Sequence, residues 1–149
     1  MRLGKDMLFW IIIMILMFVA ATEDLFTKEI SLLLPASCGA VSIVYVASQI
    51  IRGEGGILEA IASLIPGLIF VFLAFATRES IGYGDGLMML GFSPVLGFEK
   101  TCFCIVVALT LSSILSLFIL VLGKGNRNTR ISFVPMLAIG VGVTFLAQV

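Results

Sequence analysis

Six uncharged, mostly apolar runs divide the sequence, and they limit the chain to a fold built from membrane helices. The runs are residues 7–22, 30–51, 60–77, 86–98, 101–123 and 131–149. A helix crosses the ~30 Å hydrocarbon core with about 20 residues, because each residue adds ~1.5 Å. The second, fifth and sixth runs reach this length, and the first and third approach it if their helices continue into flanking charged residues. The fourth run has 13 residues with proline and glycine inside it, which predicts a short, kinked or tilted helix.

The composition agrees with this interpretation. The chain has 149 residues, of which 60% are hydrophobic and 12% are charged, whereas a soluble domain carries about 25% charged residues. We therefore expect an all-α, polytopic membrane helix bundle of about six transmembrane helices, forming one integral-membrane domain over residues 1–149. The N-terminal run also resembles a signal peptide. We expect a retained helix there, because cleavage near Ala21 would leave Asp24 on a loose new N-terminus.

The absence of histidine narrows the chemistry. A chain with no histidine and a formal net charge of zero has no Ser-His triad and no HExxH zinc site, and its charge predicts no nucleic-acid binding. The three cysteines, Cys38, Cys102 and Cys104, lie inside apolar runs and are interpreted as buried free thiols rather than metal ligands. We expect no metal and no cofactor. Carboxylates are the main acid–base candidates that remain.

One acid ends a glycine-rich stretch between two apolar runs. Residues 81–86 read Ile-Gly-Tyr-Gly-Asp-Gly, and the glycines would let the backbone take positive φ and approach a partner closely. Asp85 would then lie at the start of the next helix. A carboxylate at such a place is costly and suggests a function, although Asp is also a preferred N-cap residue.

A second acid, Asp24, follows the first apolar run. If the first three segments all span the membrane, Asp24 and Asp85 lie at the same membrane face. Two carboxylates at one face are suited to aspartic hydrolysis, in which one takes a proton from water and the other, protonated, polarises the scissile carbonyl. The alternative is that Asp24 is only one more charge at a helix end. The basic cluster from Lys124 to Arg130 favours the cytoplasm for this face.

These features together resemble the type IV prepilin peptidases, the leader peptidases among the GxGD aspartic membrane proteases. The first site of that family is an Asp followed after five residues by Ile-Pro, and here Asp24 precedes Ile30 and Ser31. The second site is Gly-x-Gly-Asp, here Gly82-Tyr83-Gly84-Asp85. The tail from Phe133 to Gly140 also resembles the last helix of the family.

The resemblance implies a membrane aspartic endopeptidase that cleaves basic leader peptides from prepilin-like proteins at the cytoplasmic face of a prokaryotic plasma membrane. Asp24 and Asp85 would be its catalytic residues, and the loop acids Glu23, Glu29 and Glu79 would either attract the basic leader or be merely solvated. Lipid and prepilin-like substrates are the expected partners. The family's paired CxxC motifs are missing, which implies a peptidase-only form.

Two departures from the family pattern leave an alternative open. Ser31 stands where the family usually has proline, and Leu87 stands where many members have lysine. The chain could therefore be an inactive relative of the peptidases. A small proton-coupled transporter or a scaffold of a secretion machine is the other non-enzymatic alternative. Whether the substrate belongs to a pilus or a secretion system, and how many copies assemble, are left open by the sequence.

Overall fold

The computed structural model describes residues 5–27, 31–76, 83–122 and 133–147, and within these residues the chain forms six α-helices. Their bounds are α1 Lys5–Thr27, α2 Leu33–Ile51, α3 Ile57–Ala76, α4 Tyr83–Leu96, α5 Phe98–Val121 and α6 Val134–Leu146. The expected all-α bundle is confirmed. Four of the helices, α1, α2, α3 and α5, are long and apolar enough to cross a membrane.

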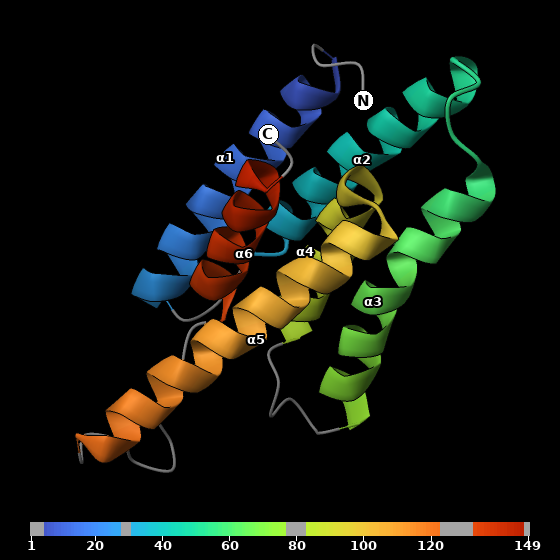
Figure 1. Ribbon diagram of the computed structural model, residues 1–149. Helices are drawn as coiled ribbons and strands as arrows, with labels where there is room; N and C mark the ends of the chain where they lie inside the picture. The colour runs from blue at the N-terminus through green and yellow to red at the C-terminus, as the bar shows by residue number, and fades with distance from the viewer. Residues whose placement is uncertain (1–4, 28–30, 77–82, 123–132, 148–149) are drawn as a thin grey trace.

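Successive helices run in opposite directions through the bundle (Figure 1). The last turns of α1, α3 and α5 and the first turns of α2, α4 and α6 therefore lie at one end, and α1 begins and α6 ends at the other. The short helix α4 lies in the middle, packed mainly on α2 and α3, while α6 packs on α1 and α5. This alternation brings the last turn of α1 and the first turn of α4 to the same end.

Close helix packing holds α4 in its central place. A Cβ added at Gly91 of α4 would lie 2.9 Å from the Pro35 carbonyl oxygen of α2, and one added at Gly67 of α3 would lie 2.8 Å from the Leu90 backbone nitrogen of α4. Small residues allow such close approach of helices in lipid. The fully buried side chains of Met88, Met89 and Phe92 on α4 then complete the core.

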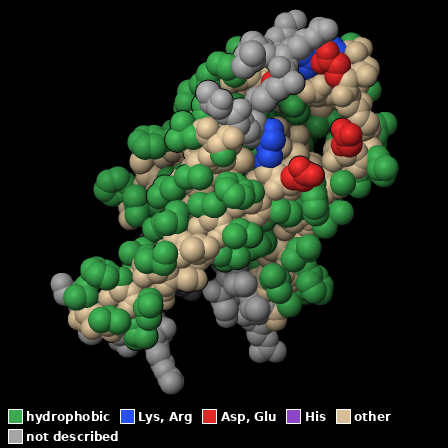
Figure 2. All heavy atoms as spheres, viewed as in Figure 1, with side chains coloured by type: hydrophobic (Ala, Val, Ile, Leu, Met, Phe, Trp, Pro, Cys, Tyr) green, Lys and Arg blue, Asp and Glu red, His purple; other side chains and the backbone are tan. Residues whose placement is uncertain are grey.

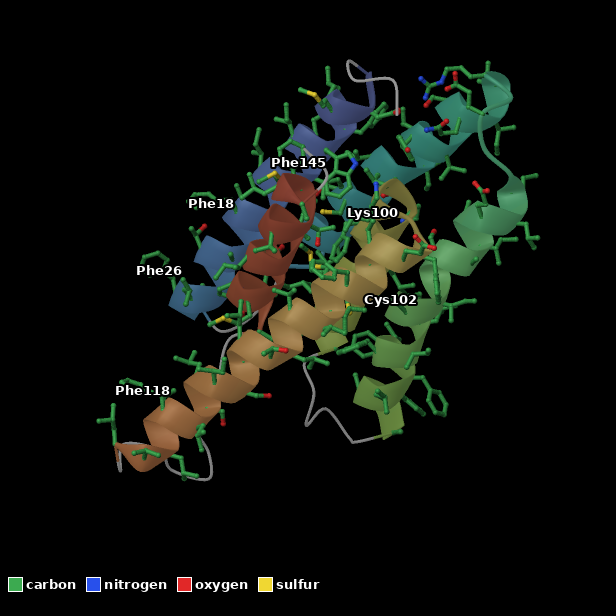
Figure 3. The ribbon with its side chains drawn as sticks, in the orientation of Figure 1. Phe18, Phe26, Lys100, Cys102, Phe118 and Phe145 are labelled. Atoms are coloured by element: carbon green, nitrogen blue, oxygen red, sulfur yellow. The ribbon has the colours of Figure 1, made fainter. Side chains whose placement is uncertain are left out.

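The outer faces of the helices are apolar, as expected for contact with lipid (Figure 2). Phe18 and Phe26 on α1 and Phe118 on α5 point away from the bundle (Figure 3), and their side chains are 69%, 89% and 62% exposed. The C-terminal part of α5 projects beyond its neighbours (Figure 1). Exposed apolar side chains over this much surface suit a protein whose solvent is the bilayer.

The sixth helix is shorter than the sequence predicted. Its apolar run suggested a full span, whereas α6 has 13 residues, from Val134 to Leu146. Phe133 occupies the N-cap position and Pro135 lies in the first turn, where proline is favoured because its missing N–H would have no helical partner. The helix start is thus set by Pro135 rather than by the start of the apolar run.

Cys104 of α5 packs against α6 and donates its S–H to the Leu137 carbonyl at 3.6 Å.

Candidate active site

Asp24 lies in the last turn of α1 and on its inward face. The buried residues Trp10, Ile13, Met17 and Ala20 precede it on this helix, at the alternating spacing of three and four that forms one face. Asp24 continues this register, and it is only 6% exposed. The helical period of α1 therefore turns the carboxylate into the bundle rather than towards solvent.

The first turn of α6 supplies a hydrogen-bond donor to Asp24. The backbone N–H of Val134 donates a hydrogen bond to the Asp24 carboxylate. Val134 is itself fully buried, and no side chain caps α6 from its own N-cap residue, Phe133. A carboxylate beside the N-terminus of a helix is stabilised by the unpaired N–H groups and by the helix dipole. Asp24, which belongs to α1, thus acts as the capping residue of α6.

Asp85 lies in the first turn of α4, as the third residue of that helix. It therefore does not occupy the N-cap position that the sequence left open as an alternative. Its side chain is 8% exposed, so it is buried almost as completely as Asp24. The following residues Met88, Met89 and Phe92 are buried on the same side of α4, and the period of this helix turns Asp85 inward with them.

Gly84 and Gly86, the two glycines beside Asp85 that the structure describes, do not have the expected positive φ. Positive φ occurs among the described residues at Gly53 and Gly97, whereas Gly84 and Gly86 are helical residues of α4. Close approach, the second part of the expectation, is found at Gly86. A Cβ there would lie 2.8 Å from Val71 Cγ2 and 2.9 Å from the Val71 backbone nitrogen. Gly86 therefore lets the first turn of α4 lie directly against α3.

Asp24 and Asp85 interact electrostatically. Asp85 belongs to α4, which is not one of the four helices long enough to cross a membrane. Burial first, and then the negative charge of Asp24, raise the pKa of Asp85 to about 7. Near neutral pH the pair can therefore hold one proton, so that one group is a carboxylic acid while the other is a carboxylate. Such a pair can supply a general acid and a general base together.

The remaining predicted site residues are only partly described. Glu23 is half-buried on α1, one residue before Asp24, and Gly84 is half-buried in the first turn of α4. Gly82, Ile30, Glu29 and Glu79 lie outside the described residues. Among the described residues, no cluster of three or more His, Cys, Asp or Glu side chains is arranged to hold a metal ion.

A family comparison decides what kind of protein carries this pair. A model of the type IV leader peptidase family matches residues 11–122, from the first half of α1 to the end of α5. The chain belongs to the type IV leader peptidase family. The resemblance seen in the sequence is therefore confirmed, and the family indicates a peptidase of the prepilin type. Searches of curated proteins and of solved structures gave no match.

The structure describes both residues that depart from the leader peptidase pattern, Ser31 and Leu87. Ser31 is exposed just before α2, and its hydroxyl accepts a long hydrogen bond of 3.5 Å from the Leu33 N–H. Leu87 is half-buried in α4, two residues after Asp85. A lysine at this position would bring a positive charge close to the pair and favour its fully ionised form. Leucine at this position brings no such charge.

Proposed function

We propose that this leader peptidase is an aspartic endopeptidase in which Asp24 and Asp85 act as a pair on one water molecule. The observation that supports the proposal is the convergence of two buried carboxylates, 6% and 8% exposed, from helices far apart in the sequence. They interact strongly enough for Asp24 to raise the pKa of Asp85. Burying two acids side by side is expensive, and perturbed carboxylates of this kind are typical of functional sites.

The pair would act in two linked steps. The ionised carboxylate takes a proton from water as the water oxygen attacks the scissile carbonyl carbon. The protonated carboxyl donates its hydrogen bond to the carbonyl oxygen, which stabilises the developing charge. The proton then passes to the leaving nitrogen, and the peptide bond breaks into a carboxylic acid and an amine. The Val134 N–H, which donates a hydrogen bond to Asp24, would orient that carboxylate.

The substrate we propose is a prepilin-like protein with a short, basic leader, cut at the cytoplasmic face of a prokaryotic plasma membrane. The family supports the class of substrate. The cytoplasmic assignment is supported by the sequence between α5 and α6, which holds Lys124, Arg127 and Arg130, since basic loops resist translocation. The place of Asp24 and Asp85 at helix ends also favours a peptidase over a transporter, whose acids usually lie near the bilayer midplane.

The direct test is co-expression with prepilin-like proteins from the same genome. We expect the mass of one such protein to fall by the mass of its leader when the wild-type peptidase is present. A variant lacking both carboxylates, Asp24→Ala with Asp85→Ala, should leave the prepilin intact. Cleavage by that double variant at the wild-type rate would remove the aspartic mechanism.

A topology prediction follows from the alternating helices. In a background with Cys38, Cys102 and Cys104 replaced, single cysteines at Thr27, Tyr83 and Leu122 should react with an impermeant maleimide from one side of the membrane. Cysteines at Glu54 and Ala147 should react from the other side. All five positions are exposed. Labelling of Thr27 and Tyr83 from opposite sides would separate the two carboxylates and contradict the proposed site.

A pH prediction follows from the shared proton. The pKa of Asp85 is raised to about 7, so the protonated form is present below that pH and is lost as the pH rises through it. We expect kcat/KM for leader cleavage to fall about tenfold per pH unit on the alkaline side, because the doubly ionised pair has no acid to donate. On the acid side it should also fall, as the second carboxylate is protonated. A profile that is flat from neutral to pH 9 would show that no such proton is needed.

A further inference from the structure

A polar cavity lies at the end of the bundle opposite the Asp pair, where α2 ends and α3 and α5 begin. It is a cavity of about 200 Å³ lined partly by charged side chains. Acidic and basic side chains gather around a hollow at this end (Figure 2). The charged lining residues are Asp6, Glu54, Glu59 and Lys100. The proposed peptidase chemistry at the other end uses none of them.

An apolar groove continues from this cavity along the membrane-facing side. Its volume is about 500 Å³, and its lining is almost wholly apolar. The lining residues lie between Gly39 and Ile50 on α2 and between Ile57 and Leu64 on α3, with Leu90 and Pro94 from α4. It exists because α2 and α3 scarcely touch each other and are both held by α4. The cavity and the groove share four lining residues, which are Val46, Ile50, Ala60 and Pro94. The two are therefore one continuous feature with a charged end and an apolar length.

We propose that the cavity and groove together bind one phospholipid whose headgroup is zwitterionic and carries a primary amine, as in phosphatidylethanolamine. A charged cavity that opens into an apolar groove matches the division of a lipid into headgroup and acyl chain. The charged end of this feature lies away from the Asp pair, because the cavity is lined by the C-terminal part of α2 and the N-terminal part of α3. The lipid would thus come from the leaflet opposite the Asp pair.

The charges of the cavity fit both ends of such a headgroup. Arg52 lies 3.7 Å from Asp6 and 3.5 Å from Glu54, so its single positive charge is shared between those two acids. Glu59, in the first turn of α3, is then placed to accept hydrogen bonds from the ammonium group. Lys100 is placed to bind the phosphate, and it is held over the Trp10 ring at 5.5 Å from the ring centroid.

The start of α5 supports the phosphate position. Its N-cap residue, Gly97, has a φ of 83° and makes no side-chain cap, and Gly97 lines the cavity together with Lys100. The first N–H groups of a helix and its dipole favour an anion at this place. The cavity thus offers a lysine and a helix N-terminus to the phosphate, and a carboxylate to the amine.

Retained lipid can be measured without any substrate. The wild-type protein would be reconstituted in bilayers of equal phosphatidylethanolamine and phosphatidylglycerol, extracted gently, and examined by native mass spectrometry. We expect one retained phosphatidylethanolamine, enriched about tenfold over phosphatidylglycerol, because a charge-assisted hydrogen bond to Glu59 discriminates between the headgroups by roughly that factor. Glu59→Gln should remove the preference, and Lys100→Gln should lower the retention of both lipids.

A variant that fills the groove tests the acyl-chain part. Gly39 lines the groove, and a Cβ added there would meet no atom within 4 Å, so the side chain of Gly39→Leu would begin in open space. Leucine also favours a helix more than glycine does. We expect retained lipid to fall at least about tenfold. Gly142→Leu is the matched control on α6, where the nearest atom to an added Cβ is Met14 Cε at 4.0 Å, and it should retain lipid as the wild type does.

Other occupants would be recognised by cross-linking. Ile43 lines the groove and is 72% exposed, so a photoreactive residue in its place should react with lipid. Capture of a prepilin-like protein or of a second copy of this chain at Ile43 would overturn the lipid proposal. Unchanged retention in Gly39→Leu, or no headgroup preference in the wild type, would overturn it as well. None of these results depends on whether Asp24 and Asp85 cleave a leader.

Discussion

The Asp85→Asn variant is expected to lose leader cleavage by a factor of about 10² to 10⁴ in kcat/KM, which is the usual contribution of a general acid or base. The amide keeps the size and shape of the carboxyl group, so the packing around the first turn of α4 is preserved. It cannot exchange the proton that the mechanism needs. Asp24→Asn should cause a loss of the same order. The measurement is the initial rate of leader release by purified variants on one prepilin-like substrate.

Two other acids serve as controls for these variants. Asp6 lies on the same helix as Asp24 but at the opposite end, where it pairs with Arg52 at 3.7 Å, so Asp6→Asn should cleave within a few-fold of the wild type. Glu23 is the direct neighbour of Asp24, is half-buried, and should tolerate Glu23→Gln similarly. A large loss in all four variants would indicate a general structural effect. Near-wild-type cleavage by Asp85→Asn would contradict the paired mechanism.

The second large effect is expected at Gly86, next to Asp85. In Gly86→Ala the new Cβ would lie 2.8 Å from Val71 Cγ2 and 2.9 Å from the Val71 backbone nitrogen, so α4 must move away from α3. Overpacking of this kind costs about 1–3 kcal/mol of stability. A displacement of about 1 Å at a catalytic group costs on the order of 100-fold in rate. We therefore expect Gly86→Ala to lower kcat by about 100-fold.

The matched control is Gly142→Ala, which adds the same methyl group to a helical glycine of α6, where the nearest atom to the new Cβ would be Met14 Cε at 4.0 Å. It should leave both the melting temperature and kcat near wild-type values. Combining Gly86→Ala with Val71→Ala removes the Cγ2 contact but keeps the contact with the backbone nitrogen. We expect this double variant to recover only part of the lost rate. Full activity in Gly86→Ala alone would show that the close packing of α4 on α3 does not position Asp85.

The helices and their order follow from local properties of the sequence. Uncharged runs predict apolar helices, and α1, α2, α3 and α5 are confirmed as long enough to cross a membrane. The parity of the first three segments predicted that Asp24 and Asp85 lie at one end, and the alternating helices agree (Figure 1). The register of Trp10, Ile13 and Met17 on α1 could also have shown that Asp24 faces inward.

The parts that could not be predicted depend on contacts between distant segments. No local pattern at Val134 indicates that its N–H meets the Asp24 carboxylate, because that contact depends on how α6 packs against α1. For Gly86 the sequence predicted positive φ and close approach to a partner, but it could not identify that partner, because Val71 lies on another helix. The charged cavity was missed for the same reason, because Glu59 and Lys100 come together only in the folded bundle.

The hydrogen bond from Val134 to Asp24 has a consequence for biogenesis. Asp24 is inserted into the membrane early in synthesis, whereas Val134 leaves the ribosome only near the end of the described chain. Until α6 has packed against α1, Asp24 lacks the N–H that orients it. A nascent chain that already holds both carboxylates therefore still lacks the arrangement proposed for catalysis. In the proposed mechanism, peptidase activity begins only after α6 has packed against α1.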